Sequence, residues 1–140
     1  MSEREPAKGR DRRRFIRTDA SFSILYKIKA PFEVVIEVGK NEIDSIAEDI
    51  GEGGIALISN HELPVKTQVS MTFKIFNEAA IREADSYRSF EVAGEVRYTV
   101  PWSKEGSRLG VRFMNISEPE REFIAHYVKT NSLRLDSSQP

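Results

Sequence analysis

Four arginines stand close together near the start of the chain, at Arg12, Arg13, Arg14 and Arg17. Their mutual repulsion is costly unless an anion lies nearby. Guanidinium groups donate paired hydrogen bonds to phosphates and also stack on planar bases. The cluster therefore indicates a site for a ligand with phosphates and bases. Taken alone, the same residues fit a solvated basic linker or a weak tether to nucleic acid or a membrane surface.

A second candidate site is a glycine-rich turn that follows Asp49 and contains Gly51, Gly53 and Gly54. Glycine lets backbone N–H groups approach a ligand closely. The Asp49 carboxylate can accept hydrogen bonds from N–H donors of a ligand. Taken alone, this segment also fits an ordinary β-turn with no ligand, so its meaning depends on what accompanies it.

The two motifs together, an RxxxR spacing followed by a DxSxxG-like turn, resemble the PilZ domain family, whose members are bacterial receptors for cyclic di-GMP. The resemblance implies that Arg13 and Arg17 are the two arginines of the first motif, assisted by Arg12 and Arg14. It also implies that Asp49 binds guanine and that Gly54 is the terminal glycine of the second motif. The similarity covers about residues 12–130, with later family-like segments at 94–98 and 108–113.

One position departs from the family pattern, because Gly51 stands where the family usually has serine. Loss of one hydroxyl contact weakens binding by about 0.5–1.5 kcal/mol, which need not abolish it. The resemblance also makes Tyr98 a candidate for stacking on a base, although an ordinary core or rim tyrosine fits this position equally well. The expected cyclic di-GMP site therefore comprises seven residues: Arg12, Arg13, Arg17, Asp49, Gly51, Gly54 and Tyr98.

Nothing in the sequence favours catalysis. There are no cysteines, which removes thiol chemistry and cysteine metal sites, and His61 and His126 lack metal-ligand spacing. The acidic residues at 42–49 read more simply as a solvated stretch than as a general acid–base pair. We therefore expect a protein that is not an enzyme and that needs no cofactor or metal besides its nucleotide ligand.

The elements that must position these residues are mostly strands. Apolar residues alternate with polar ones, as on a half-buried strand, in segments at 22–28, 34–38, 69–75, 90–98 and 109–113, with a shorter apolar run at 55–58. About six short strands with turns between them predict an antiparallel barrel, because closure removes exposed sheet edges. Ser117 and Glu120 form a capping box that predicts one helix with an apolar face.

The expected fold is therefore mainly β: a six-stranded antiparallel PilZ-type β-barrel with a C-terminal α-helix and a flexible N-terminal arm. We expect a disordered arm at residues 1–11, a single PilZ domain at 12–130 and a flexible tail at 131–140. Residues 1–17 carry seven basic and three acidic side chains, whereas the whole chain has a net charge of −1. A basic arm on an acidic body suggests an anionic partner for the arm.

These features predict a cytoplasmic receptor that orders its arginine arm around cyclic di-GMP and signals to a partner protein, without a membrane span and without nucleic acid. A degenerate PilZ adaptor that binds a protein and has lost the nucleotide site, as Gly51 allows, is the first alternative. The second alternative is a small β-barrel that binds nucleic acid through its arm. The acidic body and the lack of an aromatic-studded basic sheet face argue against it.

Overall fold

The computed structural model describes residues 17–77, 80–83, 86–104 and 106–138, and the side chains of this set as far as residue 131. The expected flexible arm, with Arg12, Arg13 and Arg14, lies outside the described residues. The elements run in the order β1 (Arg17–Asp19), β2 (Ser23–Ala30), α2 (Phe32–Val38), β3 (Ile43–Gly51), β4 (Gly54–Ser59), β5 (Gln68–Phe76), β6 (Tyr87–Ser103), β7 (Gly106–Phe113) and α3 (Glu118–Ser138).

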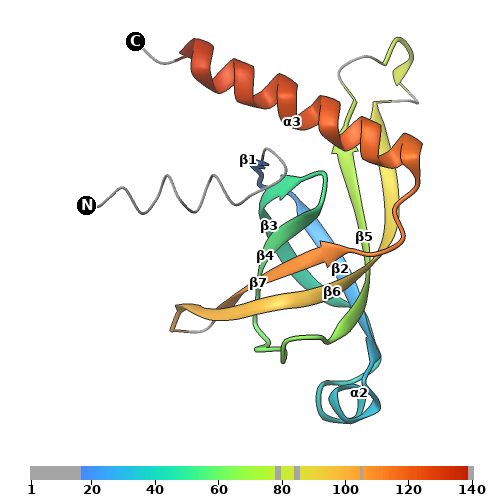
Figure 1. The fold of residues 1–140 in the computed structure, drawn as a ribbon, viewed down its shortest axis with the longest axis vertical. Helices are drawn as coiled ribbons and strands as arrows, with labels where there is room; N and C mark the ends of the chain where they lie inside the picture. The colour runs from blue at the N-terminus through green and yellow to red at the C-terminus, as the bar shows by residue number, and fades with distance from the viewer. Residues whose placement is uncertain (1–16, 78–79, 84–85, 105, 139–140) are drawn as a thin grey trace.

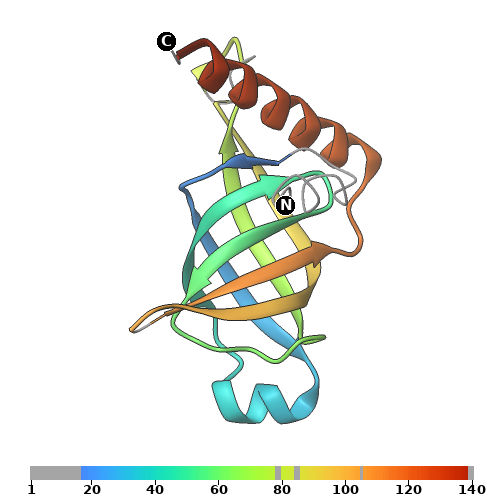
Figure 2. The same ribbon diagram turned by 60° about the vertical axis from the view of Figure 1, so that its left-hand side comes forward.

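Within the described residues, six antiparallel strands close into a barrel, in the order β3-β2-β5-β6-β7-β4 and back to β3 (Figure 1). The short strand β1 pairs with the end of β3 and adds an extra strand outside the closed ring. In both views α3 crosses one end of the barrel and α2 lies at the opposite end (Figures 1 and 2). The predicted six-stranded barrel with a C-terminal helix is therefore confirmed.

Alternating side chains of the strands fill the barrel. Inward-facing residues of β2, β5, β6 and β7 are buried, among them Ile24, Tyr26, Met71, Phe90 and Leu109. The Tyr26 hydroxyl shares a hydrogen bond of 2.5 Å with Ser59 Oγ inside this core. Burial raises the pKa of Tyr26 above its ordinary value, and the hydrogen bond to Ser59 partly opposes the shift.

The helix α3 closes one end of the barrel. The predicted capping box is present: the Glu120 N–H donates to Ser117 Oγ at 3.3 Å, and the Ser117 N–H donates to Glu120 Oε1 at 3.1 Å. Ile124 and Val128 are buried against the core, and α3 contacts β1 and β3. The helix continues to Ser138, so it includes most of the segment that the sequence assigned to a tail. No helix in the described part of the chain is long and apolar enough to cross a bilayer.

The prediction of a strand at 34–38 is wrong, because this segment forms the helix α2. Its β-branched valines and apparent period of two favoured a strand. Pro31 and Gly39 bound the segment as a helix instead, and the Gly39 N–H donates to the Val35 carbonyl at 2.8 Å. Only Val34 of the helix is buried.

The strand β3 was not among the predicted strands, because its acidic residues were interpreted as a solvated stretch. Two of its inward residues, Ser45 and Ala47, are small, so the alternation of hydrophobicity is weak before the buried Ile50. The Ser45 hydroxyl donates to the Ile24 carbonyl at 3.0 Å, which satisfies a buried polar group. On its other edge β3 pairs with β4, and this pairing closes the barrel.

Candidate functional site

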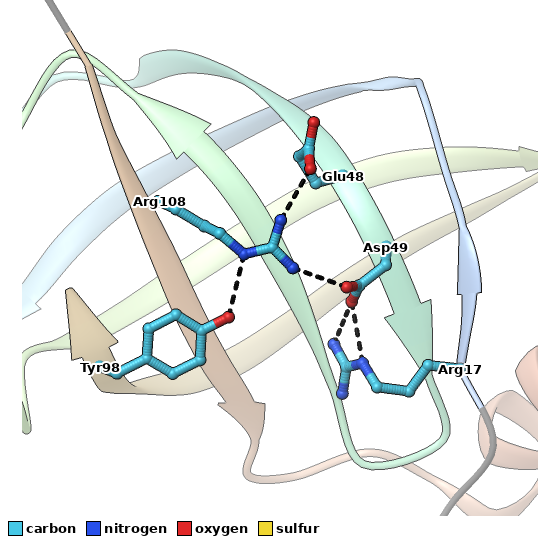
Figure 3. Close-up of polar contacts among 5 residues, drawn as sticks. All are labelled: Arg17, Glu48, Asp49, Tyr98 and Arg108. Carbon is cyan, nitrogen blue, oxygen red and sulfur yellow. Dashed lines mark hydrogen bonds and ion pairs between the residues drawn. The ribbon is translucent and has the colours of Figure 1, made fainter. Parts of the chain in front are cut away.

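The arginine motif reaches the described part of the structure at Arg17, the first residue of β1. Pairing of β1 with β3 sets Arg17 opposite Gly51 and Asp19 opposite Asp49. From this position the Arg17 side chain turns onto the Asp49 carboxylate. Its Nε donates to Asp49 Oδ1 at 2.8 Å, and a terminal nitrogen reaches the same oxygen at 2.5 Å (Figure 3).

A β-bulge in β3 brings two acidic side chains to the same place. Ala47 pairs with Leu57 and Asp49 pairs with Ala56. Glu48 is therefore an extra residue of β3 between two consecutive pairs with β4. Such a bulge re-aims side chains that regular alternation would send to opposite faces. Glu48 and Asp49 consequently both reach the guanidinium of Arg108.

Arg108, near the start of β7, is the centre of this cluster. One terminal nitrogen donates to Glu48 Oε1 and the other to Asp49 Oδ2, each at 2.7 Å, and Nε donates to the Tyr98 hydroxyl at 3.2 Å (Figure 3). Its guanidinium carbon also lies 5.1 Å from the centre of the Trp102 ring. Burial acts to lower the pKa of Arg108, but Tyr98 and Asp49 outweigh this effect and raise the pKa, so the side chain stays charged.

Tyr98 lies across Gly110 of the neighbouring strand. A β-carbon built at Gly110 would come 2.0 Å from the Tyr98 ring, so the absence of a side chain lets the ring lie flat against β7. The β6–β7 pairing shifts register between Val96 and Tyr98. Tyr98 keeps 40% of its surface exposed, so its ring is accessible to a ligand.

Arg108 and Tyr98 line one cavity of about 520 Å³, a size typical of small-molecule sites. Of the predicted site residues that the structure describes, Arg17, Asp49, Gly54 and Tyr98 lie in the wall of the cavity. Gly51 pairs with Arg17 beside the cavity but does not line it. Gly54 brings β4 close to β7, because a β-carbon there would lie 2.3 Å from the Val111 carbonyl oxygen.

Four arginines of the wall were not among the predicted site residues: Arg97, Arg108, Arg112 and Arg121. With Arg17 they make five guanidinium groups against one lining carboxylate, Asp49, in the cavity that the described residues form. Glu95 lies 3.1 Å from Arg112 and 4.0 Å from Arg97, so two arginines share one nearby carboxylate. The alternation of Arg108, Gly110 and Arg112 along β7 was the available signal for an outward-facing basic strand.

The arrangement suits an anionic ligand that also carries flat bases. Guanidinium groups supply donors for phosphates, Tyr98 supplies an aromatic face and Asp49 supplies acceptors. No group of three or more histidine or acidic side chains that could hold a metal ion occurs among residues that the structure describes. The cavity therefore favours binding of a nucleotide-like anion.

Comparisons with known proteins agree with this description. The family model for the PilZ domain matches residues 11–130. No curated protein sequence matches the chain. Among solved structures, the inhibitor of motility MotI (DgrA) of Bacillus subtilis aligns with a TM-score of 0.65 and 19% identity, over 88% of this chain and 52% of that one.

Two further structures align with the same fold. Escherichia coli YcgR in complex with cyclic di-GMP aligns with a TM-score of 0.61 and 13% identity, over 90% of this chain and 48% of YcgR. A tetrameric PilZ protein of Xanthomonas campestris, self-assembled through a helical bundle, aligns with a TM-score of 0.60 and 10% identity, over 96% of this chain and 98% of that one. The chain thus spans about half the length of MotI and of YcgR.

Proposed function

Because the chain belongs to the PilZ domain family, we propose that it is a receptor for cyclic di-GMP that signals to a partner protein. One observation carries the proposal. Arg17 and Asp49, which lie 32 residues apart and come from the two family motifs, meet in a single arginine-lined cavity. The YcgR structure, whose fold is similar, contains cyclic di-GMP.

In this proposal the chain's own residues divide the recognition of the ligand among them. Arg17, with Arg12 and Arg13 of the preceding arm, binds the phosphates. Asp49 accepts hydrogen bonds from a guanine, and the exposed ring of Tyr98 stacks on a base. The ligand must first take Arg17 from Asp49, because the Arg17 guanidinium occupies Asp49 Oδ1.

The proposed signal is a change in the surface around β1. The arm before Arg17 orders around the nucleotide, and the ordered arm together with β1 forms a face that a partner protein recognises. Both the partner and the cytoplasmic location remain predictions from the sequence. The protein acts by binding, with no catalytic step.

The proposal is tested by calorimetric titration of the full chain with cyclic di-GMP, with GTP as the control ligand. We expect selective, saturable binding by the wild type. Arg17→Ala should weaken it by about tenfold or more, because a hydrogen bond to a charged group contributes about 1.5–3 kcal/mol. Lys74→Met is the matched control, since it removes one positive charge from an exposed position of β5 outside the cavity wall.

A degenerate adaptor is the competing proposal, and Gly51 is the observation that favours it. The position opposite Arg17 has no hydroxyl to offer a ligand. A flat titration of the wild type at high micromolar cyclic di-GMP would contradict the receptor proposal. The adaptor, which binds a protein and no nucleotide, would then be the better account.

A further inference from the structure

The two oxygens of the Asp49 carboxylate are held by different arginines. Arg17 contacts Oδ1 and Arg108 contacts Oδ2. The two arginines belong to very different elements: β1 is three residues long and pairs with β3, whereas β7 is eight residues long and lies inside the closed sheet between β6 and β4. Arg108 is thus anchored in the barrel, and Arg17 is attached to its margin.

Arg108 also holds Tyr98, the other side chain that the proposed function places against the ligand. All three of its nitrogens donate, to Glu48, to Asp49 and to the Tyr98 hydroxyl, and only 18% of its side chain is exposed. A guanidinium group has a rigid planar fork of donors, so three acceptors held at once are also fixed relative to one another. Asp49 and Tyr98, which both line the cavity, are thereby held on either side of the Arg108 guanidinium (Figure 3).

We propose that Arg108 is a positioning residue of the nucleotide site, which holds Asp49 and Tyr98 in place so that the ligand displaces Arg17 alone. The inference rests on the proposed function and adds to it a role for a residue outside both sequence motifs. Asp49 Oδ1 becomes free when Arg17 moves to a phosphate, while Oδ2 remains on Arg108.

Without Arg108, the contact between Arg17 and Asp49 would compete more strongly with the ligand for these two side chains. Asp49 could then present both oxygens to Arg17 in a two-bond pair, the strongest arrangement available to this pair of side chains. The Glu48 carboxylate would also lose its ion pair with Arg108 and would add negative charge beside an anionic ligand. Both effects lower the affinity for cyclic di-GMP without any direct contact between Arg108 and the ligand.

The test is a double-mutant cycle of Arg108→Met and Asp49→Asn, titrated with cyclic di-GMP by calorimetry. Arg108→Met should bind at least tenfold more weakly than the wild type. The two losses should add only in part, because the share of the Arg108 effect that acts through Asp49 disappears in Asp49→Asn, whereas the shares through Glu48 and Tyr98 remain. Lys74→Met again controls for the loss of one charge, and urea denaturation shows that each variant is folded.

A conservative variant separates positioning from simple charge. Arg108→Lys keeps the positive charge but replaces the fork with one mobile donor, so its affinity should fall between those of Arg108→Met and the wild type. Where Asp49→Asn binds too weakly to titrate, the cycle is read from urea denaturation without ligand. There the single losses should not add, because both variants break the same contact.

The unfavourable outcomes are distinct from one another. Fully additive losses in the titration would mean that Arg108 does not act through Asp49, and wild-type affinity in Arg108→Met or in Arg108→Lys would remove the positioning role. Additive losses in the ligand-free cycle would contradict the inference as well. A wild type that binds no cyclic di-GMP, by contrast, would overturn the proposed function along with it.

Discussion

At the scale of single residues, the contact between Tyr26 and Ser59 shows how the barrel tolerates polar groups in its core. The Tyr26 side chain is only 1% exposed, and its hydroxyl is satisfied by Ser59 Oγ, which also accepts the His61 N–H at 3.1 Å. A buried phenol with a partner contributes modestly to stability, whereas a buried phenolate would be expensive. This difference gives the protein a specific sensitivity to alkali.

We expect Tyr26→Phe to lower the free energy of unfolding by about 1 kcal/mol at neutral pH, through loss of one hydrogen bond. Burial raises the pKa of Tyr26 in the folded state, so above about pH 10 the unfolded chain releases this proton while the folded protein retains it. The wild type should therefore lose stability with rising pH more steeply than the variant, and their difference should shrink.

Urea denaturation between pH 7 and pH 11 measures this effect. Tyr87→Phe is the matched control, because Tyr87 is 61% exposed and lies edge-on against Phe76. The control shows how much the loss of one exposed tyrosine hydroxyl alone changes the free energy of unfolding across the range. A constant difference for Tyr26→Phe would show that the tyrosine does not titrate differently in the two states.

At the scale of elements, the pairing of β7 with its two neighbours depends on two glycines in different ways. At Gly54 a β-carbon would meet the backbone carbonyl of Val111, which can move only if β4 and β7 separate. At Gly110 it would meet the ring of Tyr98, a half-exposed side chain that can rotate away. The same substitution should therefore have different consequences.

We predict that Gly54→Ala lowers the free energy of unfolding by about 1–3 kcal/mol, as is usual when a well-packed site is overfilled. Gly110→Ala should cost clearly less stability but should move the Tyr98 ring from its place and weaken binding of cyclic di-GMP. Denaturation and titration of both variants measure the two effects. Equal destabilisation by the two substitutions would contradict the expectation that only the β-carbon at position 54 meets a backbone atom that cannot move away.

Elements also show what could be predicted from the sequence. The strands β2, β5 and β7 were predicted because large apolar residues such as Ile24, Met71 and Leu109 alternate with polar ones. The strand β3 was not, since Ser45 and Ala47 face the core and a bulge then interrupts the alternation. The helix α2 is too short for its period to be distinguished from that of a strand.

The residues of the candidate site likewise include some that the sequence predicted and some that it did not. Arg17 and Asp49 were predicted from motifs, because the family places chemistry at fixed spacing. Arg108 was not, since its role exists only when β7 pairs with β4 and β6 and when the bulge turns Glu48 and Asp49 to one side. The alternation of Arg108, Gly110 and Arg112 indicates only a strand with an outward basic face, and the sequence does not show which acceptors that face meets.

At the scale of the whole molecule, binding at the cavity should stabilise the entire domain. A ligand that binds only the folded state at 100 times its dissociation constant adds about 2.7 kcal/mol. For a chain of 140 residues this corresponds to a rise of about 5–10 °C in Tm. Differential scanning fluorimetry with cyclic di-GMP should show this rise for the wild type and a much smaller one for Arg17→Ala.

GTP at the same concentration is the control for nonspecific anion effects in that experiment. An equal rise with GTP would mean that the cavity responds to phosphate charge without distinguishing the cyclic dinucleotide. A rise that persists in Arg17→Ala would place the ligand away from the two motifs.

The cluster of Arg17, Arg108, Glu48 and Asp49 is electrically balanced, with two cations and two anions in direct contact. These two arginines thus have their counterions on the protein itself, in the carboxylates of β3. An open basic surface holds salt ions instead, and their release into solution drives the capture of any polyanion. At this cluster an incoming phosphate gains no such release, because the carboxylate it replaces stays on the protein. At this cluster nucleic acid therefore gains no entropy from counterion release, whereas a small ligand that satisfies both the freed arginine and the freed carboxylate is favoured.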